Sequence, residues 1–171
     1  MKDILKEDRF NSISNDDKAF IIAFDNEMTK LGYDSGDKIG SGSVWGKYMI
    51  IYRKSGVKSK KVFARIYIRD ERVVLRLFFS NIDWHREFIE NSAAHIKMVF
   101  AGDLGNCQPC HNDKDGICGF RKAYTLEGRL IEKCNGTTFE FHNPSTSEIA
   151  DYMDLFTEFY QGKKRSRKQA L

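Results

Sequence analysis

Four cysteines in one stretch of the chain are its side chains best suited to metal or thiol chemistry. Cys107 and Cys110 are spaced C-x2-C, and Cys118 and Cys134 follow. A C-x2-C pair can present two thiolates to one ion from a single turn, and two further thiolates complete a tetrahedral site. The sequence therefore predicts a metal centre built from these four cysteines, with His111 as an alternate ligand.

Zinc is the metal that this ligand set suggests first. Zn²⁺ takes four thiolates without redox chemistry, and a closed site of this kind stabilises folding. The same cysteines permit an iron–sulfur (Fe-S) cluster, although the sequence has no C-x2-C-x2-C run. A thiol-redox pair at Cys107 and Cys110 is a third interpretation. In the simplest alternative, Cys134 is a buried apolar side chain and His111 takes its place.

The histidines give no comparable pattern for catalysis. His85 and His95 are ten positions apart on one expected helix, so they lie on different faces. No Ser-His-Asp or paired-carboxylate arrangement can be assigned from the sequence, so no catalytic residue is named. We therefore favour a binding or interaction module. The alternative is a small-molecule enzyme, or a ligand or redox sensor, that uses the cysteine cluster or an adjacent pocket.

A second candidate site lies on an expected β-hairpin over residues 62–69 and 72–79, with Asp70 and Glu71 as its loop. This register places one face wholly in the core and puts Arg65 opposite Arg76. The residues expected on the other face near this pair are Phe63, Tyr67 and Phe78. Arginines between aromatic side chains suit an anionic ligand or single-stranded nucleic acid. In the alternative interpretation, acidic side chains pair with these arginines.

The rest of the pattern indicates an α+β fold. Apolar spacing predicts helices over 15–31 and 83–100, the second bent or broken at Asn91-Ser92, and a last helix that begins with the capping box Ser145-x-x-Glu148. Strands are expected over 44–53, 123–126, 130–134 and 137–141, with Asn135-Gly136 as a hairpin turn. We expect a mainly antiparallel sheet with helices packed on one face and a cysteine-rich metal-binding loop.

Length and charge set the organisation of the chain. Its 171 residues suit one domain over 14–162, after a flexible lead-in over 1–13. Residues 163–171 form a basic tail that is expected to be disordered. Five positive charges lie in this tail, so the net charge of +4 leaves about −1 for the rest. No secretory or membrane-spanning segment is expected, which favours a cytoplasmic protein. The oligomeric state is not indicated.

A family resemblance rests on the C-terminal half of the chain. The cysteine spacing, Arg121-Lys-Ala-Tyr124-Thr-Leu-Glu-Gly and Glu132-Lys-Cys134-Asn-Gly-Thr-Thr-Phe139 resemble a group of small uncharacterised proteins of clostridial-type bacteria. The order of helices and strands is more distantly similar to YdhG/YjbR-like α+β domains. The resemblance implies a fold class and carries no activity.

Overall fold

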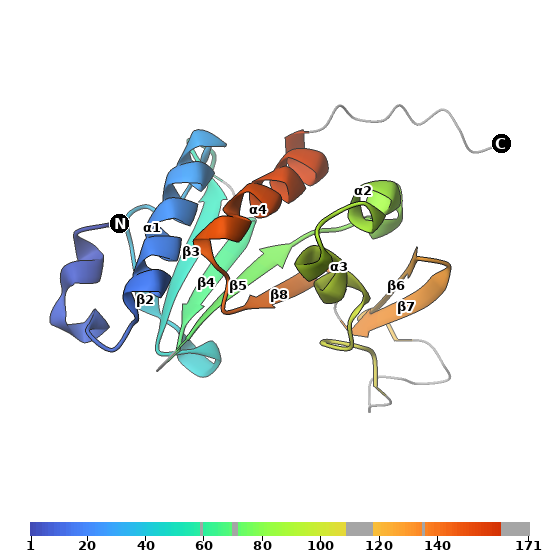
Figure 1. Ribbon diagram of the computed structural model, residues 1–171, viewed down its shortest axis with the longest axis horizontal. Coiled ribbons are helices and arrows are strands. Elements are labelled where there is room, and N and C mark those ends of the chain that lie inside the picture. Colours follow the sequence, from blue (N-terminus) through green and yellow to red (C-terminus); the bar gives the residue numbers. More distant parts are fainter. Residues whose placement is uncertain (59, 70–71, 109–117, 135, 162–171) are drawn as a thin grey trace.

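The computed structural model describes residues 1–58, 60–69, 72–108, 118–134 and 136–161. An antiparallel sheet forms its centre, with strand order β1-β3-β4-β5-β8 and with β2 also pairing with β3 (Figure 1). The bounds of these strands are β1 Tyr33–Asp34, β2 Gly40–Ser41, β3 Tyr48–Lys54, β4 Ala64–Ile68, β5 Val73–Phe78 and β8 Thr138–His142. The expected α+β class with a mainly antiparallel sheet is confirmed.

Two long helical segments cover one face of this sheet: α1 (Asn15–Lys30) and α4 (Ile149–Phe156), which continues as a helical turn through Gln161. Both lie on the same side of the strands in Figure 1. Their aromatic side chains meet the sheet and each other, as in the Phe24–Tyr52 and Phe20–Tyr152 ring contacts at 5.4 and 6.3 Å. The core therefore lies between the sheet and these two helices.

Local signals in the sequence explain where these helices begin. The Ser14 hydroxyl accepts a hydrogen bond from the Asp17 N–H, which caps α1. Before α4, the Glu148 carboxylate accepts a hydrogen bond from the Ser145 N–H at 2.9 Å, as the capping box predicts. The glycine after α1, Gly32, has a φ of 83°, which favours glycine at a helix end.

The expected helix over 83–100 is present as three pieces. A 3₁₀ turn over Ile82–His85 leads into α2 (Arg86–Glu90), and α3 (Ala94–Ala101) follows. The break falls at Asn91 and Ser92, whose side chains donate to the carbonyl oxygens of Glu87 and Phe88. Side-chain hydrogen bonds of this kind compete with the helical backbone, which explains the break.

The first residues of the chain contact the core. Residues 1–13 contain two 3₁₀ turns, Ile4–Lys6 and Asp8–Phe10, each with a buried apolar side chain. Leu5 and Phe10 are buried, and the Phe10 ring contacts Tyr48 at 5.0 Å. The apolar side chains among the charges of this segment hold it against β3.

A separate hairpin, β6 (Arg121–Leu126) and β7 (Arg129–Cys134), projects from the sheet beside α3 (Figure 1). The two strands around 135–136 do not form the expected hairpin, because β8 pairs with β5 in the main sheet. Asn135 itself lies outside the described residues. Phe139 and Phe141 of β8 are buried in the core, and the Phe139 ring stacks on Phe100 of α3 at 4.1 Å. Core burial therefore overrides the local turn signal.

Within the described part of the chain, three hydrogen bonds attach the β6–β7 hairpin to the helices and the 3₁₀ turn before α2. The Tyr124 hydroxyl donates to the Phe100 carbonyl at 2.6 Å, and the Thr125 and Glu127 N–H groups donate to the carboxylates of Asp83 and Glu90. These bonds fix one end of the hairpin and leave the cysteines at its other end. None of the described helices is long and apolar enough to cross a membrane.

Candidate functional site

The three described cysteines gather at one end of the β6–β7 hairpin, which we call the cysteine corner (Cys107, Cys118 and Cys134). Cys134 ends β7 and is paired in register with Arg121, the first residue of β6. The Arg121 N–H donates to the Cys118 carbonyl at 3.1 Å. The Arg121 Nε lies 3.3 Å from the Cys107 Sγ and donates to it. One arginine therefore contacts or pairs with all three cysteines.

Backbone hydrogen bonds explain how Cys107 reaches this corner. Its N–H donates to the Glu132 carbonyl, and the Cys134 N–H donates to the Gly105 carbonyl, both at 2.8 Å. Between these bonds, Asn106 forms an antiparallel bridge with Lys133. The segment before the C-x2-C pair is thus held at the edge of β7 by an isolated antiparallel bridge.

Lys133, on the buried face of β7, also binds the segment that leads to Cys107. It is only 4% exposed, and its ammonium donates to the carbonyl oxygens of Gly102 and Leu104. Burial lowers the pKa of Lys133, and the Asp103 charge opposes this shift. The sequence analysis did not identify this residue. Its position two residues after buried Ile131, on the inward face of a strand, was the available signal.

The cysteine corner is accessible and carries free thiols. Cys107 and Cys118 are half-buried, Cys134 is exposed, and none of the three forms a disulfide. The remaining predicted ligands, Cys110 and His111, lie outside the described residues. Among the residues that the structure does describe, no group of three or more His, Cys, Asp or Glu side chains is arranged to hold a metal ion. The backbone thus gathers three cysteines without presenting a complete ligand set.

The second predicted site has the expected register. Arg65 is opposite Arg76, and Tyr67 is opposite Val74, across β4 and β5. Arg65 and Arg76 both donate to the Tyr67 hydroxyl, at 3.1 and 3.2 Å. The loop residues Asp70 and Glu71 lie outside the described part of the chain. We call this surface the arginine face and define it by its central residues, Trp45, Arg65, Tyr67, Arg76 and Phe78.

Arg76 is the buried member of the pair. It is 7% exposed and forms an ion pair with Glu140 of the neighbouring strand β8. Its guanidinium lies 4.3 Å from the Trp45 ring centre and 4.8 Å from that of Tyr67. The alternative interpretation, in which an acidic side chain pairs with the arginine, is therefore correct for Arg76.

Arg65 differs from Arg76 in its surroundings. It is half-buried, and its guanidinium lies 5.4 Å from the Phe78 ring centre. Among the described residues, no carboxylate oxygen lies within 4.0 Å of it, whereas Arg76 has Glu140. The Nε atoms of both arginines are buried without a hydrogen-bond partner. The face therefore holds one guanidinium that is paired with a carboxylate and one that, among the described residues, is not.

Two of the aromatic residues lie where the sequence analysis did not expect them. Phe63 is not on the arginine face but in the core, where its ring contacts Tyr33 and Tyr160, both at 4.8 Å. It precedes β4, outside the regular alternation of that strand. Trp45, expected within a strand, belongs instead to a 3₁₀ turn over Ser43–Trp45. This turn places its ring over Arg76.

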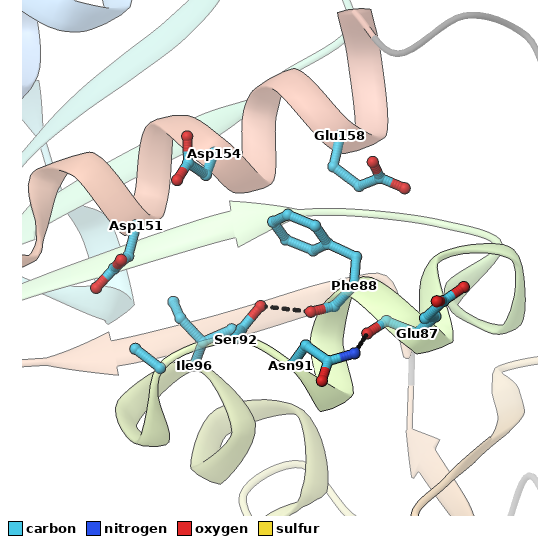
Figure 2. A pocket seen from close by; sticks show the side chains of 9 residues that line it. Glu87, Phe88, Asn91, Ser92, Ile96, Asp151, Asp154 and Glu158 are labelled. Atoms are coloured by element: carbon cyan, nitrogen blue, oxygen red, sulfur yellow. Dashed lines mark hydrogen bonds between the residues drawn. The ribbon is translucent and has the colours of Figure 1, made fainter.

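A cavity of about 550 Å³ lies between the α2–α3 connection and α4 (Figure 2). Four carboxylates line it, and its other polar side chains, Asn91 and Ser92, donate to the carbonyl oxygens of Glu87 and Phe88. The acidic residues are Glu87, Asp151, Asp154 and Glu158. His85 lies 2.7 Å from Glu158, and His95 lies 3.5 Å from Asp151. The first contact connects the turn after α4 to the 3₁₀ turn before α2, and the second connects α4 to α3.

The fold and these sites define an α+β protein in which a cysteine-bearing hairpin is attached to the helices beside the main sheet. Comparisons with protein-family models, curated proteins and solved structures gave no significant match. The functional argument therefore depends on the chemistry of the two sites.

Proposed function

We propose that this protein is a small zinc-stabilised binding module. The observation that carries the proposal is the convergence of Cys107, Cys118 and Cys134 on Arg121 at one end of the β6–β7 hairpin. The sequence supplies Cys110 three residues after Cys107 as the fourth ligand, with His111 as the alternate ligand. Four thiolates form a closed tetrahedral zinc site that contributes directly to folding.

Such a site would act at the cysteine end of the hairpin. The hydrogen bonds to the helices lie toward the hairpin turn, whereas the cysteine end is joined to the Cys107 segment by backbone bonds and by the Lys133 ammonium. A metal ion at the cysteine corner would connect the Cys107 segment, Cys118 and β7. Arg121, which already donates to a cysteine sulfur, would support and orient that thiolate as an outer partner.

The binding role rests on the arginine face. Its residue Arg65 is not paired with a carboxylate among the described residues and lies beside aromatic rings, which suits an anionic partner. Nucleic acid is the partner class that the sequence pattern favours. A zinc–thiolate site persists in a reducing compartment, so we place the protein in the cytoplasm.

Elemental analysis and a visible absorption spectrum of the purified, reduced protein test the metal. We expect one zinc per chain, no colour, and a fall in melting temperature on chelation. Cys107→Ser and Cys134→Ser should lower both zinc content and melting temperature. Leu130→Ser, at an exposed position of the same strand, is the control and should leave zinc content unchanged.

Two results would overturn the zinc proposal. A protein that purifies without metal under reducing conditions, and whose melting temperature is unchanged in both cysteine variants, has no structural metal site. Iron with a brown chromophore would instead indicate the Fe-S cluster and the alternative function as a redox or ligand sensor.

A further inference from the structure

Four described arginines share the side of the sheet that forms the arginine face. Besides Arg65 and Arg76, it carries Arg69 just after β4 and Arg72 just before β5, which share its side of the sheet by alternation. Among the described residues of these strands and β8, the carboxylate on this side is Glu140, which pairs with Arg76. Asp70 and Glu71 of the connecting loop lie outside the described residues, so the excess of positive charge refers only to the described part of the face.

The contacts of Arg76 and Arg65 give them different roles. Arg76 is held by Glu140, Tyr67 and the Trp45 ring, so it positions the aromatic side chains of the face. Arg65 donates from Nη1 to the Tyr67 hydroxyl and, among the described residues, has no carboxylate partner. An oxyanion is the acceptor that best matches the planar donors of such a guanidinium.

Trp45 provides a second element of recognition beside this charge. Its ring lies over the Arg76 guanidinium and at 6.4 Å from the Tyr67 ring, yet the residue remains 48% exposed. A large aromatic side chain that is held on one side and exposed elsewhere can stack on a planar base. An acidic peptide would use the arginine but has no general need for the aromatic surface.

We propose that the arginine face binds single-stranded nucleic acid, with a backbone phosphate at Arg65 and a base stacked on Trp45. This inference rests on the binding role proposed above and names its partner. It does not depend on the metal. The zinc measurement and the binding measurement can therefore fail separately on the same preparation.

Fluorescence anisotropy with a labelled oligo-dT strand tests the phosphate contact. We expect Arg65→Ala to weaken binding about tenfold and to reduce the slope of log affinity against log salt by about one phosphate contact. Arg129→Ala, which removes the same charge from an exposed position in β7, should leave binding unchanged. Arg65→Lys keeps the charge without the planar donors and should give an intermediate loss.

Tryptophan fluorescence tests the stacking contact. In a Trp84→Phe background, Trp45 is the remaining tryptophan, and oligo-dT should quench its emission. In the same background, Trp45→Ala should weaken binding about 5- to 150-fold, the range of one base–aromatic stack. A thermal melt of each variant confirms that it is folded.

Three results would overturn the inference. Arg65→Ala and Trp45→Ala, both folded, could bind the strand as tightly as the unchanged protein. A poly-glutamate peptide of matched charge could compete as well as the oligonucleotide, which would identify a general polyanion site. Binding that survives both substitutions and is lost on removing residues 163–171 would place the contact in the basic tail.

Discussion

Arg65 and Arg76 lie opposite each other in neighbouring strands and donate to the same oxygen atom, the hydroxyl of Tyr67. Two like charges in register repel each other. The arrangement persists because Glu140 neutralises Arg76 and because aromatic rings flank both guanidinium groups. The Tyr67 hydroxyl thus accepts hydrogen bonds both from Arg76, which is paired with Glu140, and from Arg65, which has no carboxylate partner among the described residues.

Breaking the buried ion pair should be costly. Glu140→Gln leaves the Arg76 charge buried without compensation, and we expect a loss of about 3 kcal/mol in the free energy of unfolding. The double replacement Arg76→Met with Glu140→Leu removes both charges and should be much closer to neutral. Urea denaturation measures both. Equal destabilisation by the single and double variants would contradict the role assigned to the pair.

Lys133 should stabilise the segment that leads to Cys107. Lys133→Met removes the donor to the Gly102 and Leu104 carbonyls, and we expect a loss of about 1–3 kcal/mol. The effect should appear as faster amide hydrogen exchange at Asn106 and Cys107. Lys122→Met, an exposed lysine opposite Lys133 in β6, is the matched control and should change little. Equal changes in unfolding free energy and hydrogen exchange in the two variants would contradict the role of Lys133 in stabilising this segment.

Gly136 should not tolerate a side chain. An added Cβ would lie 2.8 Å from the Lys122 Cβ and 2.9 Å from the Lys133 Cβ, so β6 and β7 would have to shift. We expect Gly136→Ala to destabilise the protein by about 1–3 kcal/mol, the range for overpacking. At Gly119 nothing lies within 4 Å of the corresponding Cβ. Gly119→Ala is therefore expected to be nearly neutral in the same denaturation measurement.

Stability should fall in alkaline solution because five tyrosines resist ionisation in the folded state. Desolvation by burial is the main cause that raises the pKa of each, and they are Tyr33, Tyr52, Tyr124, Tyr152 and Tyr160. The unfolded chain releases these protons near pH 10, before the folded protein does. Their contribution is therefore fully present below pH 10 and is lost as the pH rises further.

The pH effect can be traced to one of these groups. Tyr124→Phe removes one tyrosine whose pKa is raised, so the decline in unfolding free energy above pH 10 should become shallower by up to about 1.4 kcal/mol per pH unit. Denaturation at pH 9, 10 and 11 gives this slope. Lys133, whose pKa burial lowers, acts in the opposite direction, because its deprotonation releases a buried charge as the pH rises. An unchanged slope in Tyr124→Phe would contradict the prediction.

Local signals in the sequence predicted much of the fold. The capping box at Ser145 depends on neighbouring residues and the register of Arg65 with Arg76 on a short hairpin, and both are confirmed. The Asn135-Gly136 signal failed because the choice of partner for β8 depends on core packing far along the chain. That pairing is set by Phe139 and Phe141, which the turn pattern does not reveal.

The candidate sites were predictable only in part. The sequence named the cysteines and Arg65, but the positions of Arg121 and Lys133 depend on how the Cys107 segment joins β7. The distinction between Arg76 and Arg65 depends on Glu140, which is distant in sequence. Phe63 leaves the face because the regular strand begins only at Ala64. Long-range pairing thus decides which of the named side chains remain available.

The stacking of Phe100 on Phe139 at 4.1 Å has a consequence for the topology of the chain. The polypeptide leaves the sheet-and-helix body just after one of these rings and returns just before the other. The chain over 102–136, which carries the cysteine corner, therefore leaves and rejoins this body at adjacent points. Tyr124, Leu126 and Ile131 of the hairpin are buried in the same core, and the Tyr124 ring contacts Phe139 at 6.4 Å, so the hairpin closes over this stack and extends the core beyond the edge of the main sheet.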